Sequence, residues 1–138
     1  MLLSVGAEFI SEARTQEKYG LVIGTDFNIP ALFFDPEAKK VQGELYSVSD
    51  YKIDDVDALE GHPVVYTRKT MKICYEEKTV EAFVYVIEDP HEKLLAKMRL
   101  EEYKIEDTEK YIPPSKRFPE IKDVEEKRKL LSAQFKSQ

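Results

Sequence analysis

The segment 41–68 constrains the fold most, because its pattern changes from strand to helix and then stops abruptly. Within residues 41–48, Leu45 alternates with polar neighbours and the aromatic Tyr46 follows it, which favours a pleated, half-buried strand. The residues after this strand have the periodicity of a helix. We therefore predict a strand and a short helix in close succession.

The predicted helix covers residues 51–59, and either Ser49 or Asp50 can cap its first turn. Its apolar residues recur at the spacing that aligns side chains on one helical face: Ile53, Val56 and Leu59. The acidic residues off this stripe are predicted to lie in solvent: Asp54, Asp55 and Asp57. Gly61 is predicted to end the helix, and Pro63 prevents it from resuming.

Glu60 is thereby placed in the last turn of the helix, at the negative end of the helix dipole. Its ionised form is disfavoured there by about 0.3–1 kcal/mol if the side chain is exposed. Such a carboxylate suits a proton shuttle that works near neutral pH. A solvated terminal glutamate fits the same pattern, so the helix end alone leaves both interpretations open.

Other apolar runs predict further strands at residues 9–14, 21–23, 31–34, 70–75 and 80–87. The run 80–87 is apolar on both faces, so we predict that it is buried on both sides and central in its sheet. Several short strands around one helix, without regular strand–helix alternation, predict an α+β fold. We expect a small mixed β-barrel with flanking helices.

A second segment begins after the Asp89-Pro90 pair, where the composition becomes dense in lysine and glutamate. We predict a barrel domain at residues 1–90, and a charged linker with a C-terminal helix at residues 91–138. The apolar stripe of that helix is formed by Ile121, Val124, Leu131 and Phe135, with Arg128 in the same row. The helix can dock on the barrel, bind a partner or fray, and the pattern leaves these alternatives open.

Bulk properties exclude several classes of function. The 138 residues carry a formal net charge of −6, which argues against nucleic acid as a partner, because phosphate binding depends on lysine and arginine. The N-terminal segment is too short and too acidic for a membrane anchor or signal peptide. Cys74 is the only cysteine, which excludes an internal disulfide and favours a cytoplasmic location. His62 and His91 lack metal-ligand spacing, so we expect no metal and no cofactor.

A set of local motifs resembles one known family. The set comprises YGLVI at 19–23, NIP at 28–30, GELYSV at 43–48, LEGHP at 59–63, YTR at 66–68 and EAFVYV at 81–86. Together they resemble the gamma-glutamylcyclotransferase-like superfamily, and its gamma-glutamylamine cyclotransferase branch in particular. The resemblance implies that Glu60 is the catalytic base and acid. It also implies a small-molecule γ-glutamyl substrate such as ε-(γ-glutamyl)lysine, converted to 5-oxoproline and a free amine without a cofactor. His62 stays outside the predicted site, because a loop histidine after a helix end usually faces solvent.

The chain departs from the family at its first residues. Members of the family open with a strand that leads into a Tyr-Gly-Ser/Thr-Leu loop, and residues 1–7 have no such pattern. If the strand and loop are missing, we expect weak activity and an unpaired strand edge that promotes self-association. The alternative is a non-catalytic binding or regulatory module of the same fold, as a shortened form.

Overall fold

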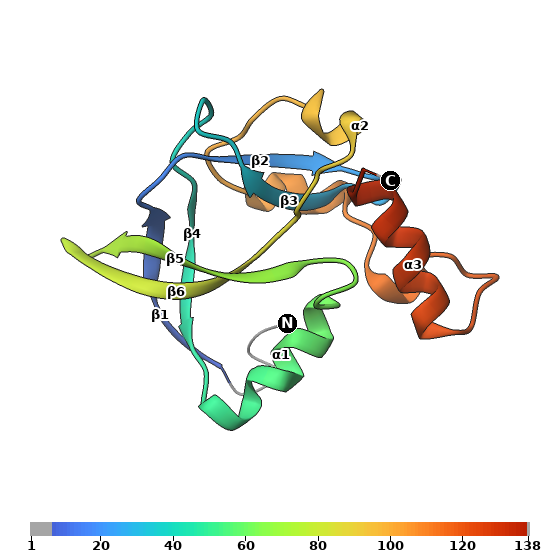
Figure 1. Cartoon of the computed structure of the whole chain (residues 1–138), viewed down its shortest axis with the longest axis horizontal. Helices are drawn as coiled ribbons and strands as arrows, with labels where there is room; N and C mark the ends of the chain where they lie inside the picture. The colour runs from blue at the N-terminus through green and yellow to red at the C-terminus, as the bar shows by residue number, and fades with distance from the viewer. Residues whose placement is uncertain (1–6, 138) are drawn as a thin grey trace.

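The computed structural model describes residues 7–137, apart from the side chains of Leu59, Glu60 and Ile105. Six strands form two antiparallel sheets (Figure 1). The four-stranded sheet has the order β4-β1-β5-β6 and the two-stranded sheet pairs β2 with β3. The strands are β1 (Glu8–Thr15), β2 (Tyr19–Gly24), β3 (Ile29–Phe34), β4 (Gln42–Ser47), β5 (Thr67–Tyr75) and β6 (Lys78–Val86).

The helical elements flank the sheets and make up most of the C-terminal third. The α-helices are α1 (Ile53–Glu60), α2 (Glu92–Leu95) and α3 (Val124–Phe135), and the 3-10 helices are η2 (Asp50–Lys52), η3 (Ile105–Lys110) and η4 (Pro114–Lys116). In Figure 1, α1 lies below the β5–β6 hairpin, and α3 lies beside the turn that joins β2 to β3. Within residues 7–137, no helix combines the length and apolar character needed to cross a membrane.

The predicted α+β class is confirmed, with one difference in how the strands close. The two sheets remain separate and do not form a continuous barrel. They meet where the Ile87 amide donates to the Leu32 carbonyl at 2.8 Å. β1 is an inner strand, but its described ladder with β5 covers only Arg14 with Cys74 and Thr15 with Ile73. Self-association through a strand edge stays a prediction.

β6 differs from the prediction in its place in the sheet. The prediction that this strand is central is wrong, because it is the edge strand beside β5. Its inward row follows the prediction, with Val86 buried in one core cluster. On the other face Phe83 is 57% exposed, and the Arg68 guanidinium lies 4.7 Å from its ring centre. The prediction that β6 is buried on both sides is therefore wrong for its outer face.

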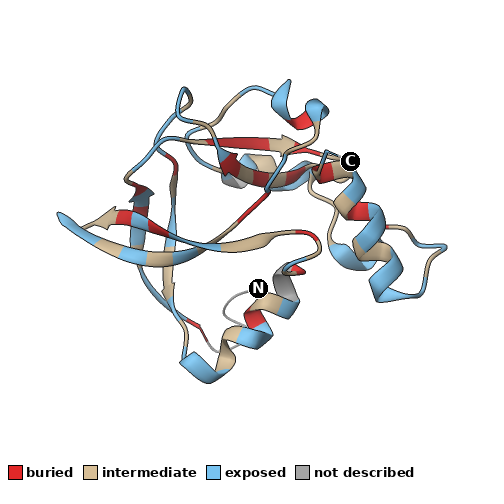
Figure 2. Cartoon of the chain, in the orientation of Figure 1, coloured by how far each residue is buried: buried red, intermediate tan, exposed pale blue. Residues whose placement is uncertain are grey.

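The larger core unites the two-stranded sheet with the C-terminal helices. Buried residues lie along β2 and β3 (Figure 2). They form one cluster with Leu94 of α2 and with Leu131 and Phe135 of α3. Phe135 is completely buried, and its ring lies 5.4 Å from that of Tyr66. Of the three alternatives for the C-terminal helix, the structure shows docking. The predicted division at residue 90 stays a prediction.

Candidate functional site

Glu60 is the last residue of α1, as predicted, although its side chain lies outside the described part of the structure. The helix begins with a 3-10 turn at Asp50 and has no side-chain cap from Ser49. Gly61 ends it in the left-handed conformation with φ 71°. The His62 amide then donates to the Asp57 carbonyl at 2.9 Å, which closes the terminal turn. Local backbone signals thus place Glu60 at a sharply defined helix end.

Asp57 joins the last turn of α1 to the β5–β6 hairpin. Its Oδ2 accepts from Arg68 Nη1 at 2.8 Å, and its Oδ1 accepts from the Tyr85 hydroxyl at 2.6 Å. The Asp57 side chain is only 16% exposed, and the Arg68 side chain is 27% exposed. The prediction that Asp57 lies in solvent is therefore wrong. Because the pair is partly shielded from water and both carboxylate oxygens are used, it is stronger than an isolated surface pair.

His62 belongs to the same cluster. Its Nδ1 accepts from the Arg68 amide at 3.1 Å, so a neutral ring carries its proton on Nε2. The ring also meets Tyr85 edge to face, with ring centres 6.5 Å apart. His62 is half-buried, so the prediction that it faces solvent is wrong. Its contacts hold the loop that follows Glu60 against the start of β5.

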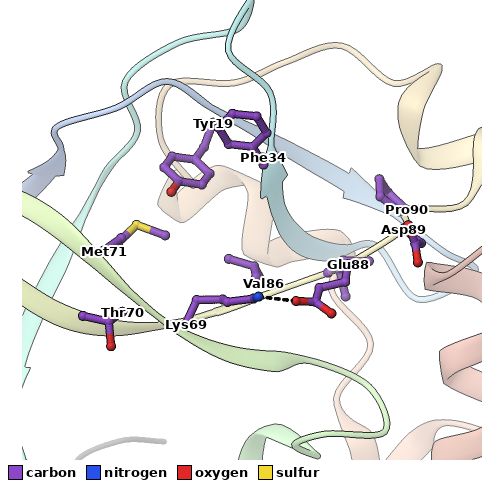
Figure 3. A pocket seen from close by; sticks show the side chains of 10 residues that line it. Tyr19, Phe34, Lys69, Thr70, Met71, Val86, Glu88, Asp89 and Pro90 are labelled. Carbon is purple, nitrogen blue, oxygen red and sulfur yellow. Dashed lines mark ion pairs between the residues drawn. The ribbon is translucent and has the colours of Figure 1, made fainter.

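A separate pocket of about 370 Å³ opens between the two sheets (Figure 3). Its walls come from β2, β3, β5, the end of β6 and the segment after it: Tyr19, Phe34, Lys69, Thr70, Met71, Val86, Ile87, Glu88, Asp89 and Pro90. Lys69 and Glu88 form an ion pair at 2.5 Å across it. The hydrogen bond from Lys69 holds the pKa of Glu88 below its usual value, and burial raises the pKa of Tyr19 above its usual value.

No described side chain of α1 lines the pocket, and its paired Glu88 is poorly suited to accept a proton near neutral pH, because its lowered pKa makes it a weak base. Among the described residues, no group of three or more histidine, cysteine, aspartate or glutamate side chains could hold a metal ion.

The family model of "Gamma-glutamyl cyclotransferase, AIG2-like" matches residues 1–105, which include every strand, α1 and α2. The chain belongs to this family. The mouse AIG2-like crystal structure resembles it with a TM-score of 0.73 and 29% identity, over 80% of each chain. The resemblance predicted from the motifs is confirmed at the level of the superfamily and its gamma-glutamylamine cyclotransferase branch.

Two curated relatives show how far the AIG2-like match extends. The "Troponin C-akin-1 protein" of Drosophila melanogaster is 38% identical over 109 residues, which are 77% of this chain and 65% of the relative. The "Gamma-glutamylaminecyclotransferase C" of Danio rerio is 43% identical over 68 residues, which are 49% of this chain and 45% of the relative. The chain therefore spans less than two thirds of the length of these relatives.

The cluster around Asp57 is what sequence reasoning missed. Asp57 lies three residues before Glu60, so the two share adjacent positions on the helix, but this spacing did not distinguish it from its acidic neighbours. Arg68 and Tyr85 lie on strands that the motifs identified. Their joint contact with Asp57 depends on how α1 packs on the hairpin, and no local pattern encodes that packing.

Proposed function

We propose that the chain is a gamma-glutamylamine cyclotransferase that converts a γ-glutamyl amine, such as ε-(γ-glutamyl)lysine, to 5-oxoproline and the free amine. The observation that carries the proposal is the family match over residues 1–105, which includes the helix end that presents Glu60. The name and the 43% identity of the Danio rerio relative support the amine type.

The reaction is an intramolecular displacement. The α-amine nitrogen attacks the γ-carbonyl carbon of the same glutamyl group, so that a new C–N bond closes the ring while the bond to the leaving amine breaks. Because both reacting groups belong to one molecule, the substrate itself supplies much of the advantage of proximity. Two protons move in all from the α-ammonium nitrogen to the leaving nitrogen. The protein must therefore carry protons and stabilise the charge that develops on the carbonyl oxygen.

We assign the proton transfers to Glu60. Its carboxylate takes each proton from the attacking nitrogen and returns it to the leaving nitrogen, so that Glu60 ends the cycle as it began. The helix end suits this role, because Gly61 ends α1 in the left-handed conformation and fixes the backbone that carries Glu60. The bonds of Asp57 to β5 and β6 hold the same turn in place.

The proposal is tested by assaying release of 5-oxoproline from ε-(γ-glutamyl)lysine by the wild type and by Glu60→Gln. The amide is nearly isosteric but cannot accept the proton, so we expect turnover to fall by at least about 100-fold. Asp55→Asn is the matched control, because Asp55 is exposed on the same helix and undergoes the same chemical change. We expect this control to keep wild-type turnover.

Two results would contradict the proposal. Retained turnover in Glu60→Gln would remove Glu60 from the mechanism. A wild type that is inactive on γ-glutamyl amines and γ-glutamyl dipeptides, while remaining folded, would favour the alternative of a non-catalytic binding module. A thermal melt of each variant separates loss of catalysis from loss of the fold.

A further inference from the structure

Helix α3 lies beyond the segment that matches the family, which ends at residue 105. It is nevertheless firmly attached to the rest of the molecule. Phe135 and Leu131 are buried in the larger core. The Ser137 amide donates to the Asp89 carbonyl at 2.7 Å, and the His91 amide donates to the Phe135 carbonyl at 2.7 Å. The helix therefore has a fixed position from which its polar side chains can act.

Two cations of this C-terminal segment bind carbonyls on both sides of Glu60. Arg128 Nη2 donates to the Ala58 carbonyl at 2.8 Å, within the last turn of α1. Lys136 Nζ donates to the Val64 carbonyl at 2.9 Å and to the Pro63 carbonyl at 3.3 Å, in the loop after that turn. The last carbonyls of a helix have no partner within the helix and carry partial negative charge, so cations are favourable partners there.

The last turn of α1 is thus held from two directions. The β5–β6 hairpin holds it through Asp57, which accepts from Arg68 and Tyr85. Helix α3 holds it through Arg128, whose other guanidinium nitrogen, Nη1, bonds Glu125 one turn away at 3.2 Å. An arginine fixed in this way by its own helix is a rigid support, because the planar guanidinium loses little freedom when it forms the second bond.

We propose that α3 positions the catalytic helix end, with Arg128 as the positioning residue for Glu60 and Lys136 as the support of the following loop. This proposal rests on the proposed cyclotransferase function for its effect on turnover. The coupling of α3 to the end of α1 depends only on the hydrogen bonds of Arg128 and Lys136, whether or not the chain is a cyclotransferase. The C-terminal helix then contributes to the AIG2-like site without contacting the substrate.

The kinetic test compares Arg128→Ala with Lys129→Ala in the full chain. Lys129 is the next residue of the same helix and is exposed. Its side chain forms no hydrogen bond or ion pair with the described residues, so the control removes the same charge without the contact. We expect Arg128→Ala to lower kcat roughly 10-fold with KM changed less than about twofold, because a small displacement of a catalytic group costs rate and not ground-state binding. Lys129→Ala should match the wild type. Arg128→Lys should recover part of kcat, because a lysine can donate one bond to the Ala58 carbonyl.

Hydrogen exchange of the loop amides supplies a readout that does not depend on turnover. The Gly61, His62 and Val65 amides donate to the Ala58, Asp57 and Gly61 carbonyls, so loosening of the turn exposes them to solvent. We expect exchange at these amides to accelerate about 5- to 10-fold in Arg128→Ala and to stay unchanged in Lys129→Ala.

The two readouts separate failure of this proposal from failure of the proposed function. If the wild type is active and Arg128→Ala keeps its kcat, α3 does not position Glu60. If the wild type is inactive, the cyclotransferase assignment fails, and the exchange rates alone decide whether α3 supports the turn. Equal exchange in Arg128→Ala and Lys129→Ala would overturn the coupling in either case.

Discussion

Removal of the Phe135 ring should destabilise the whole fold, although Phe135 is the last residue of the last helix. Its side chain has no exposed surface and packs in the cluster that contains Phe33, Ile87 and Leu94. A buried Phe→Ala change costs about 3–5 kcal/mol, through lost burial and the cavity that remains. For 138 residues, the entropy of unfolding is about 0.3 kcal/mol/K, so a loss of about 3–5 kcal/mol lowers Tm by about 10–17 °C.

Calorimetry of Phe135→Ala beside Leu130→Ala tests this reasoning. Leu130 lies on the same helix but is 39% exposed, so its truncation should shift Tm by no more than about 3 °C. Urea unfolding should show a lower midpoint for Phe135→Ala with an unchanged slope, as expected for a loss of stability without a change in the surface exposed. Equal and small shifts in the two variants would show that α3 frays in solution and that the core does not include it.

Two further predictions concern β2 and the residue after β3. Gly20→Ala should lower the free energy of unfolding, measured by urea titration, by about 1–3 kcal/mol, because the new methyl group would lie 2.6 Å from a ring carbon of the buried Phe33. The methyl group of the control Gly43→Ala has no neighbour within 4 Å, so this variant should be nearly as stable as the wild type. The hydrogen bond from Arg99 at 2.8 Å lowers the pKa of Asp35 below its ordinary value of 3.8, so its stabilising contribution is full above that value and is lost as the pH falls through the lowered pKa. Asp35→Asn should therefore be less stable than the wild type at pH 7, and the difference should shrink in acid unfolding below about pH 4; a difference independent of pH would contradict this.

Elements with strong local signals could be predicted from the sequence. Alternating apolar residues and short apolar runs located the six strands of residues 7–137 within a few positions, and Gly61 with Pro63 marked the end of α1. The errors arose where burial depends on distant partners. The outer row of β6 looked like a second buried face because Phe83 and Tyr85 are aromatic. Phe83 instead remains 57% exposed beside the Arg68 guanidinium, and the Tyr85 hydroxyl donates to Asp57.

The position of Glu60 in sequence could be found from a motif, whereas its support could not. A helix end needs only a few adjacent residues to be specified, since a left-handed glycine and the following proline act locally. The orientation of that end depends on β5, β6 and α3, which follow it by up to 70 positions along the chain. None of the residues involved, Arg68, Tyr85 and Arg128, forms a recognisable spacing with Glu60.

Glu60 and two of the residues that hold its helix end lie in different parts of the chain. The carboxylate and its helix end belong to the segment that matches the family, and Arg128 and Lys136 belong to a segment beyond residue 105. Catalysis depends on the placement of a group as well as on its identity. If α3 positions Glu60 as proposed, a change confined to α3 alters the turnover of this chain while leaving every residue of the family motif intact. On this proposal the motif indicates the type of chemistry, and the contacts on the carbonyls around the helix end determine how precisely Glu60 is placed.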